Sequence, residues 1–148
     1  MIRKVLLSFF ILLVVIQIFR TERNVSSASP DAIQRHYIVP NEIAGILKNS
    51  CNDCHSNNTI YPWYSNIQPF AWWLESHVND GKKDLNFDEF NSYSTKKKKH
   101  KLDEVVEMLE KDEMPLASYT LIHRNAILSA HDKEQMISWA RRLQKTVK

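Results

Sequence analysis

Glycine, cysteine and the alternating pattern of β-strands are all scarce in this sequence. Its 148 residues include only two glycines and two cysteines. Runs in which β-branched and polar residues alternate, as in half-buried strands, are nearly absent, whereas Leu, Ile, Lys, Glu and Ala recur at helical spacing. The sequence therefore argues against a β-rich fold and predicts one all-α domain, whose modest length limits the size of its core.

The chain beyond residue 28 has no excess of either charge. Residues 1–28 contain Arg3, Lys4, Arg20 and Arg23 against Glu22, and this excess equals the net charge of +3 of the whole chain. The rest of the chain carries 16 positive and 16 negative side chains. Such a balance gives no argument for binding a polyanion, so we predict no nucleic-acid partner.

The longest apolar run lies at the N-terminus, from Val5 to Phe19, and follows two cations. This order is typical of an export signal. The run is shorter than the roughly 18 apolar residues of a full membrane span. However, Arg20 follows it directly, and the nearest weak cleavage site is 26–28. We therefore predict a signal anchor or a cleaved signal peptide over 1–20, a linker over 21–32 and the folded domain over 33–148.

Four longer helices are predicted in the folded domain. The first begins near Pro40 and ends at the cysteines, and the second begins at Pro69 and ends at Gly81. The third carries an apolar stripe from 102 to 109 and ends near residue 113, because the residue before Pro115 is pushed toward extended geometry. The last begins with a capping box at Ser129.

Both cysteines lie in one segment, Cys51-Asn-Asp-Cys54-His55. A thioredoxin-type pair should follow a strand and open a helix, but this one follows a predicted helix. A structural zinc site needs four ligands, and no second ligand pair is available at the usual spacing. Cys-x-x-Cys-His is the signature of covalent haem attachment, in which both thiols add to haem vinyl groups and the histidine ligates iron. We predict one haem c per chain, with a disulfide or another metal site as alternatives.

The second axial ligand of the iron is less tightly specified. Met108 and Met136 fall on apolar helix stripes, which favours core packing. Met114 instead follows a helix and precedes a proline, so its thioether is the predicted ligand. His77, on the aromatic helix, is the main alternative, and His123 is another that could instead bond a haem propionate.

Aromatic residues are concentrated just after the cysteine motif. A haem has large apolar faces, and aromatic rings cover such faces well. Trp63 and Tyr64 are therefore predicted to lie near the haem, although ordinary core packing would explain them equally simply.

With the cysteine motif, the segments YPWYSNIQP and EMP…YTLIH resemble the haem-binding domain family of cytochrome c-like proteins of Bacteroidetes-type bacteria. The resemblance covers about residues 35–145. It implies a small helical domain wrapped around one covalent haem, with attachment at Cys51 and Cys54, His55 as proximal ligand and Met114 as distal ligand. Family members often have a second proline after Met-Pro, where this chain has Leu116.

These observations predict an exported, mono-haem, c-type protein that transfers one electron at a time. It would be a carrier and not an enzyme, because two filled axial positions block chemistry at the iron. A haem-based gas or redox sensor and a peroxidase-like module are the alternatives. The expected partners are an unidentified redox protein and, if the leader is uncleaved, the membrane. The domain would lie on the periplasmic side, anchored by residues 5–19 or soluble after cleavage.

Overall fold

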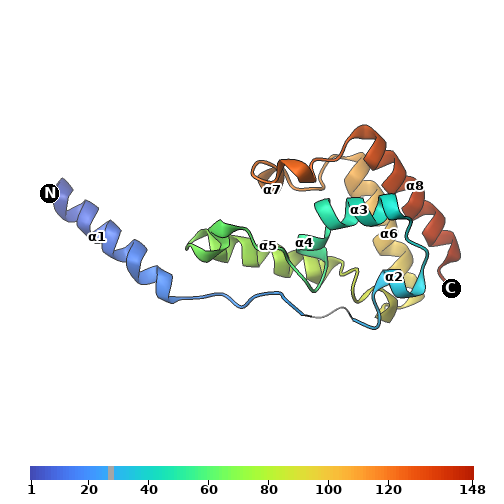
Figure 1. Cartoon of the computed structure of the whole chain (residues 1–148), viewed down its shortest axis with the longest axis horizontal. Coiled ribbons are helices and arrows are strands. Elements are labelled where there is room, and N and C mark those ends of the chain that lie inside the picture. Colours follow the sequence, from blue (N-terminus) through green and yellow to red (C-terminus); the bar gives the residue numbers. More distant parts are fainter. Residues whose placement is uncertain (27–28) are drawn as a thin grey trace.

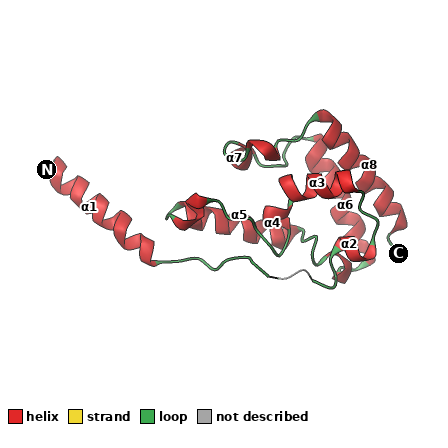
Figure 2. Cartoon of the chain, in the orientation of Figure 1, coloured by secondary structure: helices red, strands yellow, loops and turns green. Residues whose placement is uncertain are grey.

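The computed structural model describes residues 1–26 and 29–148, and its regular structure is helical (Figures 1 and 2). Ser27 and Ala28, which belong to the predicted linker and weak cleavage site, lie outside the described residues. Within the described ranges no strand forms, and one isolated antiparallel bridge joins Val25 to Asn58. The prediction of an all-α fold is confirmed.

The α-helices are α1 (Ile2–Val15), α2 (Ile33–His36), α3 (Asn41–Ser50), α4 (Asn52–His55), α5 (Phe70–Asp84), α6 (Thr95–Glu110), α7 (Ala117–Thr120) and α8 (Ala130–Thr146). Four short 3-10 helices stand between them: η1 (Ile16–Ile18), η2 (Trp63–Asn66), η3 (Phe90–Ser92) and η4 (Arg124–Ala126).

The predicted N-terminal apolar helix is present as α1. It extends away from the rest of the chain (Figure 1), and its residues are exposed except Leu13, which is half-buried. Across the described parts of the chain, no helix has both the length and the apolarity that crossing a membrane would require.

The main core lies between α3, α6 and α8, and α6 and α8 make the most extensive helix–helix contact. Leu102 and Leu109 of α6 are buried against Met136 and Leu143 of α8. The two positions in each helix are seven apart, so they lie on one face of the helix and exclude water together. The apolar stripes predicted for both helices are confirmed. Ser129 and Asp132 also form the predicted capping box of α8.

A second, smaller cluster joins η2 to α5. Its buried members are Tyr64, Leu74 and Val78. The cysteine motif lies between the two clusters: Cys51 packs against the main core, and Cys54 packs against the smaller cluster. The single turn α4 therefore connects the two halves of the domain.

Two predicted helix ends need correction. Helix α5 does not end at Gly81 but continues to Asp84, because Gly81 faces α4 at a close approach where a side chain has no room. Helix α6 ends at Glu110, three residues before the predicted position. Its first turns also contain the lysine-rich segment 96–101, which lies inside the helix.

Candidate haem site

The cysteine motif forms a bend followed by one helical turn. Cys51 ends α3, with its N–H donating to the Leu47 carbonyl at 3.0 Å, and has non-helical angles of φ −127° and ψ −45°. The His55 N–H then donates to the Cys51 carbonyl at 2.9 Å, which closes α4. Both cysteines are free and half-buried. The local fold thus presents two thiols and one imidazole from five consecutive residues.

His55 is held in one orientation by the segment that follows α5. Its Nδ1 lies 2.9 Å from the Leu85 carbonyl oxygen, and its own carbonyl accepts from the Phe87 N–H at 2.8 Å. A carbonyl can only accept, so Nδ1 carries the proton and Nε2 keeps its lone pair. Such an outer hydrogen bond is how proteins orient a histidine toward a metal.

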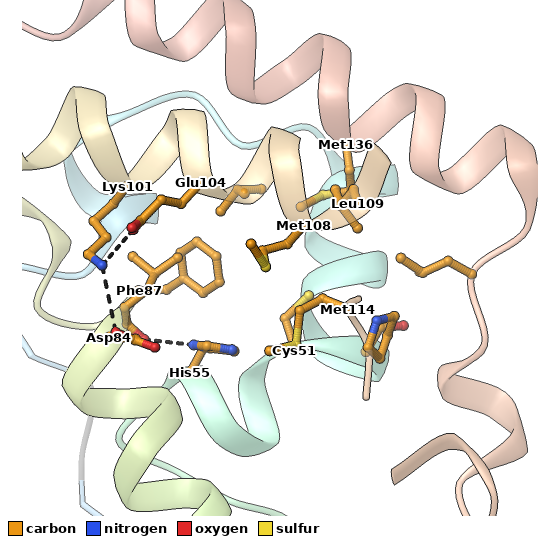
Figure 3. Close-up of a pocket in the computed structure, with 15 residues that line it drawn as sticks. Cys51, His55, Asp84, Phe87, Lys101, Glu104, Met108, Leu109, Met114 and Met136 are labelled. Atoms are coloured by element: carbon orange, nitrogen blue, oxygen red, sulfur yellow. Dashed lines mark hydrogen bonds and ion pairs between the residues drawn. The ribbon is translucent and has the colours of Figure 1, made fainter. Parts of the chain in front are cut away.

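The motif borders a cavity with two chambers that share part of their lining. Figure 3 shows the residues that line the larger one. The larger holds about 860 Å³ of atom-free space, its open mouth included, and the smaller about 770 Å³. The residues that line both chambers are Ser50, Cys51, His55, Asp84, Met114 and Pro115.

Met114 reaches the cavity because α6 ends in a tight reversal. Asp112 has a left-handed φ of 58°, the Asp112 N–H donates to the Leu109 carbonyl, and the Glu113 N–H donates to the Met108 carbonyl at 2.9 Å. This pair of bonds is a Schellman cap, in which Asp takes the position that Gly usually holds. The reversal returns the chain toward Met108, and Met114 lines both chambers.

Met108 also faces the cavity, which the prediction of simple core packing did not anticipate. It is half-buried and projects from α6 into the larger chamber (Figure 3), where the buried Met136 also contributes to the wall. Neither residue lines the smaller chamber. Three thioethers therefore face the larger chamber, but only Met114 is shared with the part of the cavity that Cys54 lines.

The two histidine alternatives are placed differently. His77 lines the smaller chamber, and its Nδ1 lies 2.8 Å from the Trp73 carbonyl oxygen, so its Nε2 also keeps a lone pair. His123 lines neither chamber. Its Nε2 is 2.7 Å from the Tyr64 hydroxyl, and its ring stacks on Tyr119 at 4.3 Å. His77 therefore remains a possible ligand by position, whereas His123 is occupied by other contacts.

Trp63 and Tyr64, both predicted to lie near the haem, differ in exposure. Trp63 is 77% exposed and lines neither chamber, so the structure does not bring it to the cavity. It opens η2 with its ring outward, and the next residue, Tyr64, takes the inward position beside Cys54. Burial raises the pKa of Tyr64, with a further contribution from Asp53. Tyr64 lines neither chamber and contacts the motif only through Cys54.

No pattern in the sequence pointed to Asp53 and Tyr119, which join the motif to α7. The Tyr119 hydroxyl donates to Asp53 Oδ2 at 2.7 Å, and Asp53 Oδ1 accepts from the Ile60 N–H at 3.0 Å. Both residues line the smaller chamber. Burial and the bond to Asp53 raise the pKa of Tyr119 far above its ordinary value of 10. This pair fixes the α7 loop over the motif.

Replacing Tyr119 by Phe should lower the free energy of unfolding by about 1.5–3 kcal/mol, the usual value for a hydrogen bond to a charged group. The folded chain keeps the Tyr119 proton above pH 10, where the unfolded chain releases it, so stability should fall as pH rises above 10. The Phe variant should show a shallower fall. Urea denaturation between pH 7 and pH 11 measures both effects. The control is Tyr93→Phe, whose hydroxyl accepts only from the neutral Asn86 N–H, and equal losses in the two variants would contradict the expectation.

The thiols themselves are not poised for redox exchange. Burial raises the pKa of Cys51 to about 12, with a smaller effect of Cys54, and raises that of Cys54 to about 11, with a smaller effect of Asp53. Thioredoxin-type motifs instead lower the pKa of the attacking cysteine. The environment therefore disfavours the disulfide-exchange alternative.

The donor set of the cavity fits a haem. Its walls offer two thiols, an oriented imidazole and thioether sulfurs. The larger chamber is lined mainly by apolar residues, whereas Asp53, Asp80 and Asp84 contribute carboxylates to the smaller one. Lys101 lies at the edge of the larger chamber, 14% exposed and paired with Glu104 at 2.5 Å and Asp84 at 3.8 Å (Figure 3). Its ammonium group is therefore already paired with carboxylates of the protein.

The helical fold and this donor set define a haem-binding protein. A family model described as the haem-binding domain matches residues 11–142, and the chain belongs to that family. Comparison with curated proteins and with solved structures gave no match. Haem as the cofactor thus rests on both the site and the family, in agreement with the resemblance seen in the sequence.

Proposed function

We propose that this chain is a mono-haem c-type protein that transfers single electrons outside the cytoplasm. Cys51 and Cys54 would hold the haem through thioether bonds, each formed by adding S–H across a vinyl group. His55 would be the proximal ligand of the iron and Met114 the distal ligand. The bound haem would supply the one-electron couple between ferric and ferrous iron.

One observation carries this proposal: Cys51, His55 and Met114 line both chambers of the same cavity. The hydrogen bond to the Leu85 carbonyl leaves His55 Nε2 free for a metal. The thioether of Met114 would stabilise ferrous iron and raise the reduction potential. With both axial positions taken by side chains, the protein would carry electrons and not turn over a substrate.

The N-terminal segment supports export and attachment. Helix α1 is apolar and exposed around its circumference, and two cations, Arg3 and Lys4, precede most of its apolar residues. Residues of this composition are typical of a segment that enters the membrane during export. We therefore place the domain at the outer side of the membrane, where its redox partner would dock.

The test is an absorption spectrum of the full chain, produced with the c-haem maturation machinery and recorded oxidised, reduced, and reduced with CO. We expect a covalent c-type spectrum that survives acid–acetone extraction, a charge-transfer band between Met and ferric iron, and no change with CO. The Cys51→Ser, Cys54→Ser double variant should lose the covalent haem entirely.

Two results would overturn parts of the proposal. Rapid CO binding by the reduced protein would show an open distal position and favour the sensor or the peroxidase, which turnover with peroxide would separate. A folded protein without covalent haem would remove the assigned roles of Cys51 and Cys54.

A further inference from the structure

A segment with several exposed aromatic side chains lies at the end of the domain next to α1. We name it the aromatic edge and define it as Trp63, Ile67, Phe70 and Trp72. Trp63 is 77% exposed, Phe70 53% and Trp72 38%. Among the described residues after Phe19, these three are the exposed Trp and Phe side chains. Exposed large apolar side chains that are concentrated in one segment often mark a contact site.

Hydrogen bonds fix the aromatic edge against the end of the N-terminal helix. Gln17, just after α1, accepts from the Gln68 N–H at 2.9 Å and donates to the Gln68 carbonyl at 3.2 Å. The Gln68 side chain, itself 2% exposed, donates to the Phe19 carbonyl at 2.7 Å. Figure 1 shows the start of α5 directed toward the region where α1 ends. The apolar helix and the aromatic edge therefore hold a defined position relative to each other.

Two arginines lie at the same corner. Arg20 donates to the Asn66 carbonyl at 2.8 Å, and Arg23 donates to Asn66 Oδ1 at 2.5 Å while its guanidinium lies 4.8 Å from the Tyr61 ring centre. Both arginines are exposed. Tryptophans and cations beside the end of an apolar helix are the composition of the lipid headgroup region, where indole rings and basic side chains are enriched.

We propose that the aromatic edge lies in the headgroup layer of an anionic membrane surface when α1 enters the lipid. The inference rests on the proposed attachment of α1 to the membrane. Lipid is the fitting occupant because α1 is apolar from Val5 to Val15 except at Ser8, with no polar face like that of a helix that packs on one partner. The hydrogen bonds between Gln17 and Gln68 hold the edge beside the end of α1, so the membrane would hold the domain in one orientation.

The experiment uses the full, haem-loaded chain in vesicles of phosphatidylethanolamine and phosphatidylglycerol that contain a photoactivatable diazirine phospholipid. After illumination, proteolysis and mass spectrometry locate the lipid adducts. We expect adducts on residues 2–15 and on residues 60–72. The exposed apolar residues of another loop, Leu121, Ile122 and Ile127, are the internal control and should carry at least roughly fivefold less adduct.

The possible results distinguish the lipid contact of the aromatic edge from the membrane attachment of α1. Adducts on 2–15 without adducts on 60–72 would overturn the aromatic edge as a lipid contact and leave the attachment intact. Absence of adducts on residues 2–15 and on residues 60–72 would overturn both the membrane attachment of α1 and the lipid contact of the aromatic edge. Crosslinks between the aromatic edges of two chains, formed in place of lipid adducts, would replace the membrane by a second copy. The absorption spectrum of the same sample reports the haem site independently.

Discussion

Replacing Met114 by Ala should abolish the charge-transfer band between thioether sulfur and ferric iron and lower the reduction potential by on the order of 0.1 V, within the range that axial ligands control. Met114 lines both chambers with Cys51 and His55, so its loss should leave the distal position without a protein ligand. The reduced variant should then bind CO. Absorption spectroscopy and a redox titration measure these changes.

Met108→Ala is the matched control, because this residue presents the same side chain to the larger chamber. Its truncation should cost about 2 kcal/mol of stability through lost packing, while the charge-transfer band persists. If the charge-transfer band were lost in Met108→Ala and kept in Met114→Ala, Met108 would be the distal ligand and Met114 a packing residue. If only His77→Phe altered the ligand spectrum, a bis-histidine site using the smaller chamber would replace the His/Met site.

The sequence predicted those parts of the site that depend on local chemistry. The spacing of Cys51, Cys54 and His55 required no knowledge of the fold, since one helical turn brings the three together. Pro115 predicted that the helix ends before Met114, although the cap at Asp112 ends α6 already at Glu110. These features could be predicted from the sequence because each depends on residues within one or two turns of the chain.

Features that depend on contacts between distant segments could not be predicted from the sequence. A helical stripe shows that Met108 faces inward, but not that the space it faces is a cavity. Trp63 and Tyr64 are neighbours of equal aromatic character, and only the packing of η2 on α5 decides that Tyr64 is buried and Trp63 exposed. Asp53 and Tyr119 are 66 positions apart, so their bond could not be inferred from spacing.

Gly81 is the clearest example of a feature that depends on contacts between distant segments. Its replacement is also expected to have a large effect on stability. Glycine commonly follows the last residue of a helix, so the sequence predicted a helix end there. In the structure it lies inside α5, and a Cβ at this position would lie 2.7 Å from the Cys54 carbonyl oxygen and 3.0 Å from the Cys54 Cβ. Because one of these neighbours is backbone, the contact can be relieved only by moving α5 away from α4.

Gly81→Ala should therefore destabilise the protein by about 1–3 kcal/mol, as overpacking usually does. The displaced α4 should also lower the yield of covalent haem. Gly45→Ala is the matched control: Gly45 lies inside α3 with nothing within 4 Å of the added Cβ. There the change should stabilise the protein by up to about 1 kcal/mol, since Ala is the better helix former. Urea denaturation of both variants measures the difference in sign, and stabilisation by Gly81→Ala would mean that α5 does not pack against the cysteine motif this closely.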